Sequence, residues 1–335
     1  MTIRTVRTVC LFTMLAASSG FADEAVTVDN FVRAESDRYF QSYVDKGGFG
    51  KLIHRRNLAP IDDQSVIRMN RDTLYSVGVF DLSNPVVIQK PEIGSRYQSM
   101  QIISQDHHTK LIVYEPGQYT ITQEMVGTRY ATVLFRTLVD TTLPNDISDV
   151  NDIQDRISIS QSSIGNFEIP VWDGDSLNRL RDALNVLGVT VPVSDGMFGD
   201  IDTVNPIHHM IGAAYGWGGI PAKDAIYVNV TPEYNDGETA YTLVVDDVPV
   251  DGFWSISLYD ETGYFQKNEA NAYSVNNLQA VGVEDGRVTV HFGGDPDQPN
   301  YLHIMNGWNY VIRLYRPRSE IFDGSWDFPE AQPVE

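Results

Sequence analysis

Cysteine is almost absent from this chain of 335 residues, which contains a single one, Cys10. It lies in an N-terminal segment that we expect to be removed, so the mature chain has no thiol. Disulfide bonds, thiol catalysis and thiolate metal sites are therefore excluded. Without disulfides the fold must depend on a buried apolar core, and the length allows two domains.

Basic residues are also scarce, because 24 Lys and Arg stand against 45 Asp and Glu and the formal net charge is −21. A surface of this sign repels phosphate backbones, so we expect no nucleic-acid partner. Aromatic residues make up 11% of the chain. That content excludes a disordered or fibrous protein, which would lack the apolar groups to offset ordering entropy.

Long apolar runs are missing, and no later segment approaches the roughly 18 residues of a membrane-spanning helix. The short run Val9–Ala17 follows two arginines and precedes the small residues Gly20 and Ala22. This order predicts a secretory signal peptide cleaved before Asp23 and a periplasmic or secreted protein; the alternative, an N-terminal membrane anchor, needs a longer run. Cleavage would leave about 313 residues (335 − 22) with a charge of −23 (−21 − 2).

The common catalytic signatures are missing too, including the nucleophile elbow, the zinc-protease helix, the phosphate loop and the dinucleotide fingerprint. Two adjacent pairs, His107–His108 and His208–His209, are the histidines that suggest metal binding. Adjacent side chains diverge on a strand or a helix, so each pair can offer one ligand at most. We therefore predict no metal site, and no motif requires a cofactor.

The sequence does contain a change of hydrophobic period along its length. Apolar residues have helical spacing after Asn30, which is placed to cap a helix, and this helix is expected to end at Gly47-Gly48. The same spacing predicts a second helix from Asp173 or Asp175 to Gly188, and Asn205-Pro206 predicts the start of a third, short helix. Alternation with a period of two predicts antiparallel strands. These are expected at 72–80, 97–103, 110–114, 119–123, 130–140, 225–230, 241–245, 253–259, 287–292 and 310–315.

Two strand segments carry candidate ligand-binding chemistry. Asn70, Arg71, Asp72 and Tyr75 place an amide, a guanidinium, a carboxylate and a phenol at the start of one strand. They would orient an anionic or sugar-like ligand with Asp72 as a base, or else form a buried network that locks the strand.

In the second segment, Phe253–Asp260, alternation puts Trp254 on a core face and Ser255, Ser257 and Tyr259 on the other. This hydroxyl face is either ordinary solvent surface or the wall of a polar pocket.

At these two segments the chain resembles a known pair of domains. The first, with Arg96-Tyr97 and Arg129-Tyr130, resembles the DUF1254 domain; the second, with Gly263, Asn268, Tyr273-Ser274 and Arg313–Pro317, resembles its companion DUF1214. One departure is Asn306–Asn309, where many relatives carry Asn-Trp-Leu-Pro. The resemblance covers almost the whole mature chain. It implies an immunoglobulin-like sandwich and a jelly roll with a helical segment between them, and it assigns no catalytic residue.

We therefore predict a mainly β protein with a short N-terminal helix. Its expected parts are the signal peptide (1–22), an N-terminal helix and loop (23–60), a DUF1254-like β sandwich (61–145), a helical segment (146–222) and a DUF1214-like jelly-roll domain (223–335).

The function hypothesis is a hydrolase or lyase acting on a small polar or saccharide-like substrate. The alternative is a non-catalytic periplasmic ligand-binding or envelope-structural protein, for which a small-molecule ligand and an oligomer are both open. The catalytic candidates are Asp72, His107 and Tyr259; the ligand-binding candidates are Asn70, Arg71, Tyr75, Arg96, Arg136, Trp254, Asn268 and Arg313.

Overall fold

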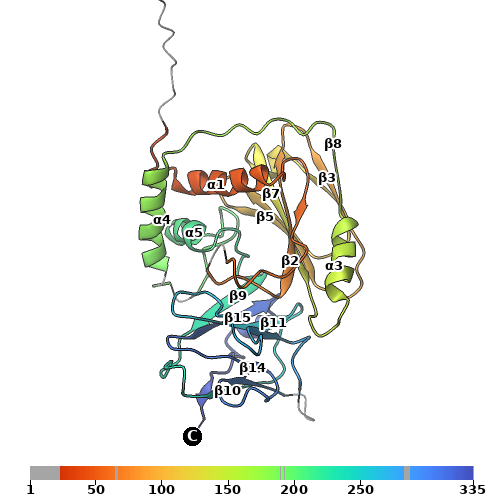
Figure 1. Ribbon diagram of the computed structural model, residues 1–335. Helices are drawn as coiled ribbons and strands as arrows, with labels where there is room; N and C mark the ends of the chain where they lie inside the picture. The colour runs from red at the N-terminus through yellow and green to blue at the C-terminus, as the bar shows by residue number, and fades with distance from the viewer. Residues whose placement is uncertain (1–22, 65–66, 189, 192, 283–286, 335) are drawn as a thin grey trace, which may run out of the picture.

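The computed structural model describes residues 23–64, 67–188, 190–191, 193–282 and 287–334, so the predicted signal peptide lies outside the described residues. Two β bodies lie one above the other, and helices α1, α4 and α5 cover one side of the upper body (Figure 1). In the part of the chain that is described, no helix is both long enough and apolar enough to cross a membrane.

The N-terminal β body is a sandwich of two antiparallel sheets. Its core lies between them, where Phe80, Met100 and Phe135 from one sheet meet Val86 and Ile88 from the other. The five-stranded sheet has the order β1 (Ile53–His54), β2 (Thr73–Asp81), β7 (Tyr130–Leu138), β4 (Gln98–Ser104), β5 (Thr109–Val113), and the three-stranded sheet the order β6 (Gly117–Ile121), β3 (Val86–Lys90), β8 (Ser158–Gln161).

The C-terminal β body consists of two four-stranded sheets around an apolar core, which matches the predicted jelly roll. Trp254, Ile256 and Leu258 face this core, as their alternation predicted. One sheet has the order β12 (Ser274–Asn276), β11 (Trp254–Tyr259), β15 (Asn309–Tyr315), β9 (Ala225–Val230), and the other the order β14 (Tyr301–Leu302), β13 (Val288–Phe292), β10 (Tyr241–Val245), β16 (Gln332–Pro333).

The departure from the family motif at Asn306–Asn309 becomes part of this core. Trp308 is fully buried and stacks on Phe292 with ring centroids 5.2 Å apart. Asn309 donates to the Asp260 carbonyl oxygen (2.6 Å). In this chain the segment therefore has a structural role, because it joins the C-terminal core to the turn that follows β11.

Three helices pack on one another beside the N-terminal body through Phe31, Leu177, Leu184 and Ile211. The predicted start of the third is confirmed, because the Asn205 side chain accepts from the amides of the first helical turn. The helices are α1 (Phe31–Asp45), α2 (Gln123–Val126), α3 (Asp146–Asp155), α4 (Gly174–Gly188), α5 (Pro206–Tyr215) and α6 (Ser319–Phe322).

Two local expectations differ from the structure. Asn30 precedes α1, but its side chain makes no capping bond; its Oδ1 accepts from the Thr27 amide (2.8 Å), so the predicted side-chain cap is wrong. The predicted helical segment 146–222 also contains β8, which pairs with β3 within the three-stranded sheet. Ile157 and Ile159 alternate with Ser158 and Ser160, so β8 left a short signal with a period of two that the prediction of a helical segment missed.

The two β bodies meet through polar residues on their facing sheets and through a buried aromatic cluster, in which Tyr97 contacts Phe253 (ring centroids 5.1 Å apart) and Tyr315 (5.6 Å). On the N-terminal side, Tyr75 of β2 lies opposite Arg136 of β7, and on the C-terminal side Arg313 of β15 lies opposite Ser255 of β11. All six residues of β11 are buried, so the hydroxyl face of this strand is covered and is not a solvent surface. We call this buried polar zone the interdomain layer.

Candidate functional site

The interdomain layer is held together by hydrogen bonds between the two bodies. The Asn70 amide donates to the Tyr315 hydroxyl (2.8 Å), and the Tyr259 hydroxyl donates to the Met69 carbonyl oxygen (2.8 Å). The Asn276 amide donates to the Asp72 carboxylate (3.2 Å). The loop before β2 is thus bonded at three points to the C-terminal body.

Asp72 is a buried carboxylate whose hydrogen bonds are incomplete. It is 1% exposed, and its Oδ2 has no hydrogen-bond partner among the described residues. Burial raises the pKa of Asp72, against the opposing effects of Arg313, Ser255 and Asn276. A carboxyl group in this setting favours its protonated form more than an exposed aspartate does.

Arg313 sits on the opposite side of the same layer and is almost fully buried. It donates to the Ser257 hydroxyl (2.9 Å), the Tyr259 hydroxyl (2.8 Å) and the Arg68 carbonyl oxygen (3.0 Å). Although burial opposes its charge, the neighbouring tyrosines and Asp72 raise the pKa of Arg313. Its donors are directed at the fold, so Arg313 fixes Tyr259 in place.

Arg136 is a second buried guanidinium, and no carboxylate lies within ion-pair distance of it in the described part of the chain. It donates to Gln101 Oε1 (2.7 Å) and to the Gly218 carbonyl oxygen (2.6 Å), and it lies 5.5 Å from the centre of the Tyr75 ring. The loop between α5 and β9 therefore closes over Arg136, which connects the sheet to the helical layer.

A small pocket of about 190 Å³ opens at the edge of the interdomain layer. The Arg71 guanidinium lies in its wall, 5.3 Å from the centre of the Tyr273 ring, and donates to the Ala59 carbonyl oxygen. The residues lining this Arg71 pocket are Leu58, Arg71 and Thr141 from the N-terminal side and Asn271, Tyr273, Ser274 and Gln279 from the C-terminal body.

The charge of Arg71 is only partly compensated. None of the ion pairs formed by the described residues includes it. Burial lowers the pKa of Arg71, and Tyr273 and Asp72 act in the opposite direction. A half-buried cation without an ion-pair partner has lost hydration and gained no counter-ion, so an anion in the pocket would be stabilised.

The structure brings some of the sequence candidates together and separates others. Asn70, Asp72, Tyr259 and Arg313 share the interdomain layer, and Arg71 lines the adjacent pocket.

Three other candidates serve the fold locally. Arg96 forms an ion pair with Asp146 at the start of α3, Trp254 lies in the C-terminal core, and Asn268 bonds to Ala272 within its own turn. None of the three lines the Arg71 pocket.

His107 belongs to a separate aromatic cluster beneath the helices. Its ring stacks against His209 (5.3 Å) and Trp217 (5.4 Å), and its Nε2 accepts from the Gly218 amide (2.8 Å). Burial and the nearby histidines lower the pKa of His107 well below its usual value. Among the described residues, no three His, Cys, Asp or Glu side chains are grouped to hold a metal ion.

Sequence reasoning missed the C-terminal half of the pocket wall. Tyr273 and Ser274 were noted as family motif residues without a site role, and Asn271 and Gln279 carried no signal. Gln279 donates to Thr141 (2.6 Å) across the two bodies. Such a contact depends on how the domains pack, which local sequence patterns do not encode.

This architecture defines a class of protein with two β domains joined through a buried polar layer. The chain belongs to the two-domain DUF1254/DUF1214 family: the models of both domains, each described as a protein of unknown function, match residues 49–161 and 226–319. No curated protein matches the chain.

Two solved structures are similar in fold. The VPA0106 protein from Vibrio parahaemolyticus is 16% identical, with a TM-score of 0.68 over 92% of this chain and 98% of that one. An uncharacterized protein from Burkholderia cenocepacia is 12% identical, with a TM-score of 0.53 over 91% of this chain and 87% of that one. At these identities the likeness extends to the fold alone.

Proposed function

We propose that this protein binds a small carboxylate-bearing molecule in the Arg71 pocket. The observation that supports this function is the Arg71 guanidinium, which lines the pocket without an ion-pair partner in the described chain. Ser274, Gln279 and Thr141 add hydroxyl and amide groups to the same wall. A planar guanidinium beside neutral hydrogen-bonding groups suits a carboxylate on a polar or saccharide-like body.

The arrangement favours binding over chemistry. Tyr259 uses its hydroxyl to hold Met69 and Arg313, and His107 lies in another cluster. Asp72 is a neighbour of Arg71 in the chain but does not line the pocket. A ligand in the Arg71 pocket would therefore meet one cation and several neutral polar groups.

The test is direct binding to the full chain by calorimetry with two matched pairs of probes. We expect glucuronate and succinate to bind and their uncharged counterparts, glucose and succinamide, to bind at least tenfold more weakly. Arg71→Met should weaken the carboxylates at least tenfold, because it keeps the packing on Tyr273 and removes the charge. Arg179→Met, an exposed arginine on α4, is the matched control. Equal binding of acids and neutral counterparts would refute the proposal.

A hydrolase or lyase is the second candidate, and the observation in its favour is the buried Asp72 carboxylate next to Arg71 in the chain, whose Oδ2 has no hydrogen-bond partner among the described residues and whose pKa is raised by burial. A carboxyl group with a raised pKa is suited to general acid catalysis. Here Asp72→Asn should abolish turnover of a bound carboxylate while its affinity stays within about threefold. Loss of affinity together with a drop in melting temperature would instead assign Asp72 to the interdomain network.

We propose export through the N-terminal segment as the cellular route. The Glu24 amide donates to the Val171 carbonyl oxygen (2.7 Å) and the Asp173 amide donates to the Glu24 carbonyl oxygen (2.8 Å), so cleavage before Asp23 would leave these bonds to the fold in place. N-terminal sequencing of the protein from the periplasm or medium should begin at Asp23. A chain that keeps Arg4 and Arg7 would contradict cleavage.

A further inference from the structure

One buried histidine, His209 of α5, lies between two main-chain carbonyl oxygens. Its Nδ1 is 3.1 Å from the Met197 carbonyl oxygen, and its Nε2 is 2.9 Å from the Asp106 carbonyl oxygen. A carbonyl oxygen can only accept a hydrogen bond, and a neutral imidazole has one N–H to donate. Because the residue is 6% exposed, solvent has little access to these contacts. Both contacts are hydrogen bonds only if His209 is an imidazolium.

Two further histidine rings stack on His209. The His108 ring lies 4.5 Å from it at an angle of 4°, and the His107 ring lies 5.3 Å from it at an angle of 25°. The Nε2 of His107 accepts from the Gly218 amide (2.8 Å), so this nitrogen carries no proton. Burial is the main cause that lowers the pKa of both His107 and His108. A single positive charge in this cluster therefore belongs on His209.

The segments that meet at His209 carry more carboxylates than cations. Asp106 pairs with Arg33 of α1 (2.6 Å), and Asp200 pairs with Lys110 of β5 (2.6 Å). Helix α4 meets α5 through apolar residues. The titratable and charged side chains here are Arg33 and Asp37 of α1, Asp106, His107, His108 and Lys110 around the start of β5, Asp195 and Asp200 of the loop before α5, and His208 beside His209. The excess of carboxylates favours a positive charge at His209.

His209 joins a loop to the N-terminal β body. Met197 lies in the loop before α5, and Asp106 lies in the turn between β4 and β5. The same loop is bonded to β5, because the Thr109 amide donates to the Gly199 carbonyl oxygen (2.9 Å), and it forms one wall of a cavity of about 370 Å³. Loss of the His209 proton would leave one of the two carbonyl oxygens without its donor, which costs free energy and would loosen the loop.

We propose that His209 is a pH-sensitive joint, which holds residues 195–200 against the N-terminal β body while its ring is protonated. The unfolded chain releases a histidine proton above about pH 6.5, whereas the folded chain keeps two hydrogen bonds by retaining it. The joint therefore strengthens as the pH falls through this range and weakens as the pH rises. None of its residues lines the Arg71 pocket, so the joint does not depend on the proposed function.

The charge of His209 is measured by NMR of its ring nitrogens in the full chain, labelled with ¹⁵N and assigned through the backbone resonances of α5. At pH 6 we expect a proton on both ring nitrogens. A ring with one unprotonated nitrogen at pH 6 would overturn the proposal, because one carbonyl oxygen would then have no donor.

Hydrogen exchange of the amides at 195–200 measures the effect on the loop. After correction for the intrinsic dependence on pH, exchange should be at least threefold slower at pH 6 than at pH 8. His209→Gln keeps one donor and one acceptor but cannot take up the proton, so it should lose this difference. His291→Gln, at a partly exposed histidine of β13 in the other body, is the matched control and should keep it. The same pH dependence in His209→Gln as in the wild type would overturn the joint, and if this variant does not fold, the NMR measurement on the wild type decides the question.

Discussion

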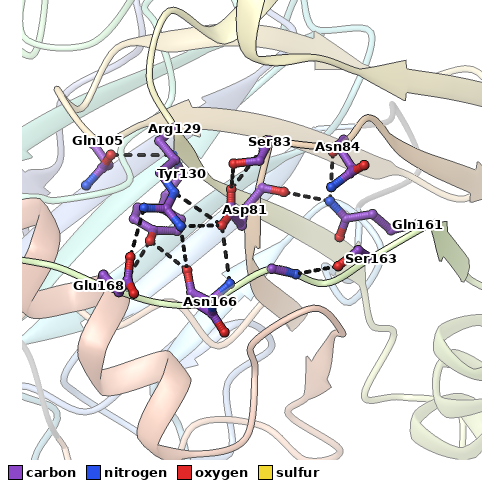
Figure 2. A network of polar contacts seen from close by, with 11 residues as sticks. Asp81, Ser83, Asn84, Gln105, Arg129, Tyr130, Gln161, Ser163, Asn166 and Glu168 are labelled. Carbon is purple, nitrogen blue, oxygen red and sulfur yellow. Dashed lines mark hydrogen bonds and ion pairs between the residues drawn. The ribbon is translucent and has the colours of Figure 1, made fainter.

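At the scale of single residues, this protein buries carboxylates in two different ways. Asp81 is 1% exposed and accepts from Arg129 Nη2 (2.9 Å), from the Ser83 hydroxyl (2.6 Å) and from the Asn166 amide (3.3 Å), as Figure 2 shows. Although burial opposes the charge, these donors lower the pKa of Asp81 to about 2. Asp72 has fewer donors, and burial raises its pKa. The number of donors to the carboxylate decides which charge state the fold favours.

Replacing Asp81 with Asn should therefore destabilise the protein in a pH-dependent way. The pKa of Asp81 in the folded protein lies below the ordinary value of 3.8. Its contribution to the free energy of unfolding is therefore fully present above pH 3.8 and is lost as the pH falls toward about 2. At pH 7 we expect the free energy of unfolding to fall by about 2 kcal/mol. The difference between wild type and variant should narrow in acid. Urea unfolding at pH 7 and pH 3 measures both effects.

The matched control for that experiment is Asp246→Asn, which removes the same charge from an exposed side chain. Its effect on the free energy of unfolding should stay within about 0.5 kcal/mol. Equal losses in the two variants would show that net charge and not the Asp81 network is responsible.

At the scale of elements, the extended segment between β8 and α4 depends on the same network. It crosses the N-terminal body above α1 (Figure 1) without forming a helix. The Tyr130 hydroxyl donates to the Asn166 carbonyl oxygen (2.7 Å) and accepts from the Glu168 amide (2.9 Å). These bonds replace the pairing that a strand would have supplied.

Gly165→Ala should loosen this segment. Gly165 has a φ of +69°, and a Cβ at this position would clash with the Asp81 carboxylate. The backbone strain at residue 165 and the displacement of the Asp81 side chain should together lower the free energy of unfolding by about 1–3 kcal/mol. Gly174→Ala is the control, because a Cβ there meets no atom within 4 Å. Limited proteolysis with fragment mapping should show faster cleavage near residue 165 in the first variant; unchanged cleavage would contradict the role of this glycine.

The elements that the sequence predicted are those with a strong local signal. The start of α5 was predicted because Asn205-Pro206 is a capping pair, and β11 because its residues alternate between core and polar faces. Strands β14 and β16, of two residues each, exist only through pairing with distant partners and leave no periodicity.

The candidate site likewise has one part that the local sequence predicts and another that only tertiary packing creates. Asn70–Asp72 was identified from its chemistry, whereas the pairing of Gln279 with Thr141 joins residues 138 positions apart. Which faces of two domains meet depends on tertiary packing, so the pocket wall could not be read from either segment alone.

At the scale of the whole molecule, the interdomain layer should make the two β bodies unfold as one unit. Separation would expose Arg136 and Arg313 with the tyrosines around them, and it would break the bonds of Asn70, Asp72 and Tyr259 across the layer. Cooperative unfolding is expected where loss of one unit leaves the other with unpaired buried polar groups.

Calorimetry of the protein should accordingly show a single transition with equal calorimetric and van't Hoff enthalpies. Arg313→Met removes the bonds to Ser257, Tyr259 and Arg68, and it should lower the midpoint of that one transition without splitting it. If the C-terminal body were an independent unit, the variant would instead split the trace and shift one component alone. The Arg71 pocket takes its walls from both bodies, so independent unfolding of one body would destroy the pocket. A single transition would instead mean that the pocket persists as long as the whole fold is stable.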